Sequence, residues 1–237
     1  LNSSKSESNR LLIIKSLSDN KIELENLSHA NDTVLLKNLI RSNSQNIWDA
    51  EDAGTTMRFL TSFLAVTKQG VLLTGTERMK KRPIKILVDA LNKIGAEISY
   101  TEKDGYPPIK INRKISQIKE SISIRGDISS QYISSLLMIA PVLPNGLKID
   151  VMPPFYSKPY VMMTLNLMKK FGIKYDLSED SISINNQKYK SGSYKVESDW
   201  SAASYWYSFI SINKKLKEIK LKGLREQSFQ GDQAIKK

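Results

Sequence analysis

The chain of 237 residues has no cysteine and no long apolar run. Without cysteine it has no disulfide framework, no thiolate nucleophile and no cysteine metal site. Apolar runs such as Leu11–Ile14 fall far short of the about 20 residues that a membrane-spanning helix needs. No charged segment followed by an apolar stretch opens the chain, so we expect neither secretion nor membrane insertion, and a cytoplasmic location.

Acidic residues are scarce relative to basic ones, 24 against 36, which gives a formal net charge of +12 at pH 7. Such an excess attracts polyanions or phosphorylated metabolites. Charge alone points first to nucleic acid. However, the basic residues are spread along the chain rather than gathered in arms, and no nucleic-acid motif is present. We therefore expect small phosphorylated ligands and no nucleic acid, with a non-catalytic polyanion-binding module as the alternative.

One type of segment recurs along the chain. Small or hydroxyl residues precede an apolar run of helical period at 52–60, 127–133 and 199–205, and residues 3–12 have the same character. The copies that begin at residues 52, 127 and 199 follow one another at intervals of roughly 70–75 residues. Repetition on this scale indicates internal pseudo-symmetry.

A second type of segment repeats at the same interval. Residues 82–95 and 158–172 each place a proline in the predicted first helical turn and a glycine just past the helix end. Short strand-like runs lie at 70–74, 98–100, 109–111 and 121–124. Strands that alternate with paired helices predict an α/β or α+β fold.

The repeated helix starts are candidate binding sites for anions, because free backbone N–H groups and the positive end of the helix dipole favour negative charge there. Serine, threonine and aspartate are also ordinary helix caps, so a single helix start of this kind is weak evidence for an anion site. Several equivalent starts with basic residues nearby favour a common phosphate site. The basic residues are Lys5, Arg10, Arg58 and Arg78, and arginine suits bidentate contact with phosphate or carboxylate.

Seven segments run in one order over essentially the whole chain: Ser4–Arg10, Ala53–Arg58, Leu73–Ile84, Gly105–Pro108, Ser129–Gln131, Ser157–Tyr160 and Val196–Tyr205. Taken together, they resemble the 5-enolpyruvylshikimate-3-phosphate synthase (3-phosphoshikimate 1-carboxyvinyltransferase) family. The cell-wall enolpyruvyl transferase that acts on UDP-N-acetylglucosamine is a weaker match. It commonly has a loop cysteine and a Lys-Asn pair, whereas this chain has Lys5-Ser6 and no cysteine.

The resemblance implies an inverse α/β prism: two domains, each with three βαβαββ-type units around a pseudo-threefold axis, and helix N-termini that face the cleft between them. On that map residues 1–196 form a complete substrate-binding domain, apart from the first few residues, which belong to the other domain. Residues 197–237 begin the second domain, which is incomplete here. The full-length protein would be a monomer.

The implied reaction transfers the enolpyruvyl group of phosphoenolpyruvate to the 5-hydroxyl of shikimate-3-phosphate and releases phosphate, without a metal or cofactor. Positioning and fixed positive charge would dominate catalysis, because both substrates are anions. By the resemblance, Lys5 is the catalytic residue and lies between the substrates. Shikimate-3-phosphate would contact Lys5, Ser6, Arg10, Ser129, Ser130, Ser157 and Tyr160; phosphoenolpyruvate would contact Lys5, Gly54, Arg78 and Gln131; Thr55 and Arg58 would support that site.

The chain departs from the family pattern at a few positions. Asp52 stands where the family usually has asparagine, and Phe59 and Trp200 also differ from the usual residues. The family's catalytic carboxylates, and the lysine and arginine residues that clamp both phosphates, belong to the second domain. No acid in this sequence is predicted to replace them, so we expect this chain alone to bind substrate without turnover.

Overall fold

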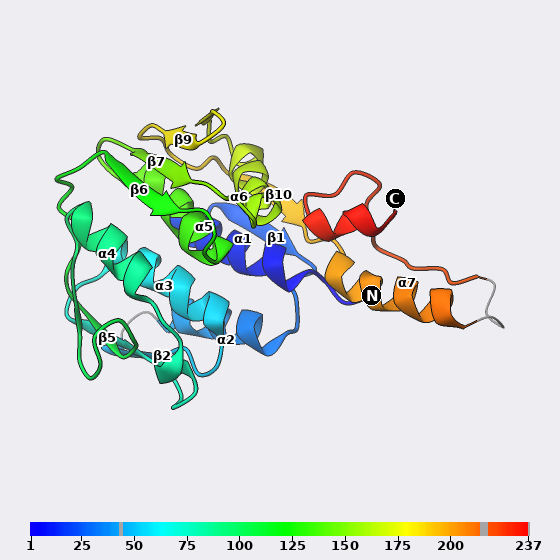
Figure 1. The fold of residues 1–237 in the computed structure, drawn as a ribbon, viewed down its shortest axis with the longest axis horizontal. Coiled ribbons are helices and arrows are strands. Elements are labelled where there is room, and N and C mark those ends of the chain that lie inside the picture. The colour runs from blue at the N-terminus through cyan, green and yellow to red at the C-terminus, as the bar shows by residue number, and fades with distance from the viewer. Residues whose placement is uncertain (43–44, 214–217, 237) are drawn as a thin grey trace.

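The computed structural model describes residues 1–42, 45–213 and 218–236. Two similar α/β units follow one another in the chain. A third unit consists of segments that come before and after them in the sequence (Figure 1). None of the described helices is both long and apolar enough to cross a membrane. The fold class is therefore α/β, as predicted from the alternation of strands and helices.

The two complete units have the same order of elements and the same sheet. In each, the first two strands are parallel, the third and fourth are antiparallel, and the fourth lies between the second and third. One consists of β2 (Ile47–Asp49), α3 (Gly54–Thr67), β3 (Val71–Thr74), the 3-10 turn η1 (Met79–Lys81), α4 (Lys85–Lys93), β4 (Glu97–Tyr100) and β5 (Ile109–Arg113). The other consists of β6 (Ser121–Arg125), α5 (Ser130–Ile139), η2 (Ala140–Val142), β7 (Leu147–Met152), α6 (Lys158–Lys170), β8 (Asp176–Leu177) and β9 (Ser181–Ile184).

The remaining unit combines α1 (Lys5–Leu17), β1 (Ile22–Glu25) and α2 (Asn31–Arg41) with β10 (Gly192–Lys195). Strands β1 and β10 are parallel, with Ile22 opposite Gly192. Strand β10 thus takes the place that β2 and β6 hold in the other units, although it comes last in the chain. Three βαβαββ units were predicted. Among the described residues two have that full order, and this one has four elements, because the chain passes from α2 directly into β2.

The six helices of the three units form the core. Each contacts the next in the ring α1–α2–α3–α4–α5–α6, α6 contacts α1, and the first helices α1, α3 and α5 also contact one another. Figure 1 shows the two four-stranded sheets on either side of these helices. Every residue of α1 from Glu7 to Ile14 is buried, as expected for a helix surrounded by others. This pattern of contacts agrees with the internal pseudo-symmetry that the sequence repeat predicted and with the pseudo-threefold axis that the resemblance implied.

One predicted helix start is wrong. Pro83 was expected in a first helical turn, but α4 begins at Lys85, and Ile84 before it has a φ of −134°. The Pro83 carbonyl accepts hydrogen bonds from the Tyr132 hydroxyl at 2.7 Å and from Arg58 Nη2 at 3.2 Å. Contacts with two other helices therefore hold this residue in the connection. Pro159, by contrast, does lie in the first turn of α6.

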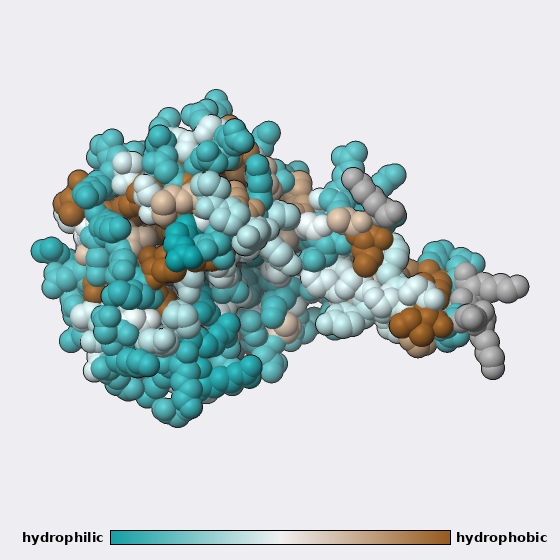
Figure 2. All heavy atoms as spheres, in the orientation of Figure 1, coloured by the Kyte–Doolittle hydropathy of each residue, from teal (hydrophilic) through white to brown (hydrophobic). Residues whose placement is uncertain are grey.

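Residues 197–213 and 218–236 project from the three-unit body as an arm that contains α7 (Trp200–Ile212) and η3 (Gly231–Lys236) (Figure 1). At its base two stretches of chain lie side by side, because Ser3 pairs with Ser198 and Ser4 N donates to the Glu197 carbonyl at 2.8 Å. Figure 2 shows apolar side chains on the arm. Tyr205 and Ile212 of α7 are 78% and 80% exposed, and several large side chains exposed on one helix are unusual on a protein surface.

Candidate functional site

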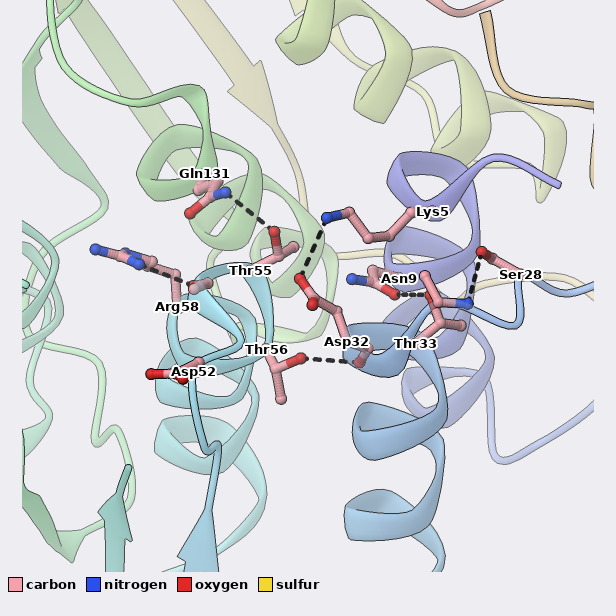
Figure 3. Close-up of polar contacts among 12 residues, drawn as sticks. Lys5, Asn9, Ser28, Asp32, Thr33, Asp52, Thr55, Thr56, Arg58 and Gln131 are labelled. Atoms are coloured by element: carbon pink, nitrogen blue, oxygen red, sulfur yellow. Dashed lines mark hydrogen bonds and ion pairs between the residues drawn. The ribbon is translucent and has the colours of Figure 1, made fainter. Parts of the chain in front are cut away.

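The N-terminal ends of four helices meet on one side of the core. Lys5 begins α1, Asp32 lies in the first turn of α2, Thr55 in that of α3 and Gln131 in that of α5. Figure 3 shows these side chains pointing toward one another. Lys5 Nζ lies 3.5 Å from Asp32 Oδ2, and Gln131 Nε2 donates to Thr55 Oγ1 at 3.0 Å. The dipoles and free N–H groups of these helices all favour an anion here.

Hydrogen bonds between the helices hold this arrangement. The Ser4 hydroxyl caps α1 by accepting from Glu7 N at 3.4 Å, which places Lys5 at the first helical position. The Thr56 hydroxyl donates to the Asp32 carbonyl at 3.0 Å and so joins α3 to α2. Two further bonds join α2 and the segment before it to α1: Thr33 to Asn9 at 2.7 Å and Ser28 N to the Ser8 hydroxyl at 2.9 Å (Figure 3).

Arg10 is a buried cation, only 3% exposed, that reaches from α1 toward α5 and α6. Burial lowers the pKa of its guanidinium to about 10. All its hydrogen bonds to the described residues go to neutral acceptors: Thr164 Oγ1 at 2.7 Å, the Ser6 carbonyl at 2.9 Å, Ser134 Oγ at 3.2 Å and the Tyr160 carbonyl at 3.5 Å. A buried charge without a counter-ion is costly, so Arg10 favours an anion nearby.

Arg58 makes a second buried positive centre, at the start of α3. Its Nη1 donates to the Gly54 carbonyl at 3.1 Å, and its Nε is buried without a hydrogen-bond partner. The guanidinium also lies 5.7 Å from the centre of the Tyr132 ring. Arg78 is exposed and lies just before η1. Gly54 leaves the first residue of α3 without a side chain, so backbone or ligand groups can approach it closely.

The remaining predicted residues lie at the starts of α5 and α6. Ser129 Oγ accepts from Gln131 N at 3.4 Å and so caps α5, while Ser130 is buried. Ser157 occupies the cap position of α6 without a side-chain cap bond. The Tyr160 hydroxyl donates to Asp232 Oδ2 at 3.1 Å, and burial together with that carboxylate raises the pKa of Tyr160. These contacts join some of the predicted residues directly: Gln131 bonds to Thr55, and Arg10 bonds to the Ser6 and Tyr160 carbonyls. Lys5 is paired with Asp32 instead.

Several residues of this region were not identified from the sequence. Asp32 is paired with Lys5, Thr164 binds Arg10, and Asp232 holds both Tyr160 and the Ser201 hydroxyl, the latter at 2.8 Å. None of them carries a local signal, because each meets its partner from a distant part of the chain. Among the described residues no group of three His, Cys, Asp or Glu side chains could hold a metal ion.

Glu7, in contrast, lies in a sequence pattern that can be recognised locally. Ser4 and Glu7 have the spacing of a capping box, in which the glutamate side chain returns to the cap residue's N–H. Here the Glu7 carboxylate instead accepts from Glu197 N at 3.2 Å and from the Tyr194 hydroxyl at 3.4 Å. Ser4 N is already bonded to the Glu197 carbonyl. Glu7 therefore joins α1 to the base of the arm.

Comparison with known proteins gives one consistent match. The model of the family EPSP synthase (3-phosphoshikimate 1-carboxyvinyltransferase) matches residues 35–237. Two curated proteins named 3-phosphoshikimate 1-carboxyvinyltransferase are similar to this chain. The one from Bacteroides fragilis (strain YCH46) is 47% identical over 234 residues, which are 98% of this chain and 56% of that protein. The one from Buchnera aphidicola subsp. Cinara cedri is 38% identical over 258 residues, 97% of this chain and 58% of that protein.

A solved structure of EPSP synthase from Acinetobacter baumannii has a similar fold, with a TM-score of 0.72 at 19% identity. It covers 87% of this chain, and the match spans 51% of the solved chain. This chain thus spans little more than half the length of the curated relatives it matches. The match to the family model over most of the chain and the shared fold lead to one conclusion: this chain belongs to the EPSP synthase (3-phosphoshikimate 1-carboxyvinyltransferase) family.

Proposed function

We propose that this chain supplies the substrate-binding domain of an enzyme that transfers the enolpyruvyl group of phosphoenolpyruvate to shikimate-3-phosphate. Two observations carry the proposal: Lys5, Thr55 and Gln131 lie at converging helix starts (Figure 3), and the buried Arg10 has no carboxylate partner among the described residues. Family membership supplies the chemistry that such an anion site would serve. A basic polyanion-binding module is not favoured, because it would not need buried cations at helix ends.

In the proposed reaction the 5-hydroxyl of shikimate-3-phosphate loses its proton as its oxygen bonds to C2 of phosphoenolpyruvate, while C3 gains a proton and becomes a methyl group. Loss of a proton from that methyl group and of phosphate from C2 then restores the double bond. Lys5 would lie between both substrates and neutralise charge as it develops. Shikimate-3-phosphate would bind Ser6, Arg10, Ser129, Ser130, Ser157 and Tyr160; phosphoenolpyruvate would bind Gly54, Arg78 and Gln131, with Thr55 and Arg58 in support.

We also propose the domain division expected from the family, with residues 1–196 as the substrate-binding domain and 197–237 as the beginning of a second one; residues 214–217 and 237 lie outside the described part. The exposed apolar side chains of α7 support this division, because an unpaired apolar helix face is typical of an interface. The cytoplasmic location, the monomeric state of the full-length protein and the lack of nucleic-acid binding remain predictions.

The proposal predicts that this chain binds shikimate-3-phosphate but does not turn over. Isothermal titration with shikimate-3-phosphate, with and without competing DNA, measures the binding, and a phosphate-release assay with both substrates measures the activity. We expect saturable binding that DNA does not displace, and phosphate release at the background rate. Binding of DNA in preference to shikimate-3-phosphate would support the polyanion-binding alternative, and clear turnover would show that the chain is catalytically complete.

Gly54→Ala is predicted to weaken phosphoenolpyruvate binding selectively. A Cβ at this position would lie 2.4 Å from Arg82 Nη2 and 2.7 Å from Arg58 Nη1, so both guanidiniums would have to move. Because both belong to side chains that can shift, we expect the free energy of unfolding to change by less than about 1 kcal/mol. Titration with each substrate checks this. A loss that affects shikimate-3-phosphate as strongly as phosphoenolpyruvate would contradict a local effect at Gly54.

A further inference from the structure

Thr164 is a fully buried threonine of α6 that contacts the charged group of Arg10. Its hydroxyl oxygen accepts a hydrogen bond of 2.7 Å from Arg10 Nε. This is the shortest of the four hydrogen bonds that the guanidinium makes with the described residues. The two residues are 154 positions apart in the sequence, so only the packing of α6 against α1 brings them together.

Neighbouring acceptors fix the orientation of the Thr164 hydroxyl. Ser134 Oγ on α5 lies 2.8 Å from Thr164 Oγ1 and accepts from Arg10 Nη2 at 3.2 Å. The Tyr160 carbonyl lies 3.0 Å from the same Thr164 oxygen. Because the hydroxyl proton can go to either of these acceptors, the Thr164 oxygen keeps a lone pair for Arg10. Helices α5 and α6 therefore hold the guanidinium through neutral groups.

The Nη1 nitrogen of Arg10 keeps a free donor. Nη1 carries two of the five N–H groups of a guanidinium. Its hydrogen bond to the described part of the chain goes to the Ser6 carbonyl at 2.9 Å. Ser6 lies in the first turn of α1, next to Lys5, where the helix starts converge. One N–H of Arg10 is therefore left for an anion on this side of the guanidinium.

We propose that Thr164 is a positioning residue for shikimate-3-phosphate, which acts by holding Arg10 so that its Nη1 meets the substrate. The inference rests on the proposed function, because that function makes shikimate-3-phosphate the anion that Arg10 binds. A side chain that is already held in its binding position loses less conformational entropy when the substrate arrives. A neutral hydroxyl suits this role, because a carboxylate at the same place would offset the attraction between Arg10 and the substrate.

The affinity test measures shikimate-3-phosphate binding to variants of the whole chain by isothermal titration. Thr164→Val keeps the shape of the side chain without the hydroxyl, and should weaken binding by about ten- to thirtyfold, because a hydrogen bond to a charged group is lost. Thr164→Ser keeps the hydroxyl and should restore the affinity to within about threefold of the wild type. Phosphoenolpyruvate, whose proposed contacts do not include Arg10, should bind both variants as it binds the wild type.

Thr61→Val on α3 is the matched control. Thr61 is also fully buried, and its hydroxyl donates to the carbonyl of Met57, four residues earlier, at 2.8 Å. Thr164 has the same relation to the Tyr160 carbonyl but bonds to Arg10 as well. Thr61→Val should bind shikimate-3-phosphate like the wild type. A loss as large as that of Thr164→Val would mean that removing any buried helix hydroxyl weakens binding, and would overturn the inference.

A second measurement uses the wild type, so it does not depend on how well Thr164→Val folds. The Nε–H signal of Arg10, assigned by ¹⁵N NMR through its absence in Arg10→Met, should be protected from exchange with water both before and after shikimate-3-phosphate binds. Rapid exchange in either state would show that Thr164 does not hold Arg10. That result, or a folded Thr164→Val that binds as tightly as the wild type, would overturn the inference alone. A wild-type chain that does not bind shikimate-3-phosphate would overturn the proposed function, and this inference with it.

Discussion

Arg10→Met is expected to abolish the binding of shikimate-3-phosphate and yet leave the fold as stable as before. Arg10 is almost fully buried and bonds only to neutral acceptors among the described residues. Removing a cation that contacts a phosphate or carboxylate in such a setting should weaken binding by at least about a hundredfold. The folded state, however, loses a buried charge that has no ion pair among the described residues, and replacing buried charges with apolar side chains of similar size is often neutral or stabilising.

The acceptors that Arg10 leaves behind have other partners, which is why we expect little loss of stability. The Thr164 hydroxyl lies 2.8 Å from Ser134 Oγ and 3.0 Å from the Tyr160 carbonyl, so it can donate to either acceptor. Urea denaturation should therefore give a free energy of unfolding within about 1 kcal/mol of the wild type, or above it. Arg41→Met, at the exposed end of α2, is the matched control and should bind shikimate-3-phosphate normally. A strongly destabilised Arg10→Met would mean that Arg10 serves mainly to hold the helices together.

Glu7→Gln is expected to stabilise the protein above pH 7 and to leave it unchanged near pH 4. Burial raises the pKa of the Glu7 carboxyl from 4.5 to about 7. Between these values the folded protein keeps a proton that the unfolded chain has lost, so the stability of the folded state falls as the pH rises. Through this difference in pKa, Glu7 lowers the free energy of unfolding by about 3 kcal/mol at most. Glutamine resembles the protonated carboxyl and does not titrate, so the variant should escape this loss.

Denaturation of wild type and variant at pH 4, 6 and 8 measures the effect, and the difference between them should grow with pH. The groups that face Glu7 are Tyr194, Glu197 and Arg225, and they are the same in both proteins. Glu23→Gln on the exposed face of β1 provides the control and should follow the wild type at each pH. Equal pH dependence in wild type and Glu7→Gln would show that Glu7 is ionised in the folded protein and stabilised there by Arg225.

The sequence predicted helix starts well where capping is local. Ser4, Ser129 and Asp199 were all expected near helix starts, and each accepts a hydrogen bond from a backbone N–H two or three residues later. The strand runs at 70–74 and 121–124 were predicted for the same reason, because alternation along a short run is a local property. Pro83 was misplaced because its carbonyl is held by Arg58 and Tyr132, which belong to other helices.

The site was predicted in part. Resemblance to the family indicated Lys5, Thr55 and Gln131, and the structure brings Thr55 and Gln131 into contact beside the Lys5–Asp32 pair. The roles of Lys5, Thr55 and Gln131 in substrate binding stay predictions. Asp32 was not assigned to the site from the sequence, because an aspartate in a first helical turn is ordinary in isolation.

By itself the sequence determined the period of the repeat, the helix starts and the excess of positive charge, because these depend on neighbouring residues and on composition. Only the tertiary structure decided which charged side chains are buried and what they contact. Arg10 is enclosed by α5 and α6, Arg82 lies over Gly54, and Glu7 is buried against the base of the arm. Burial and contact between distant segments set these environments, and they arise only when β10 returns to pair with β1 and the six helices pack together.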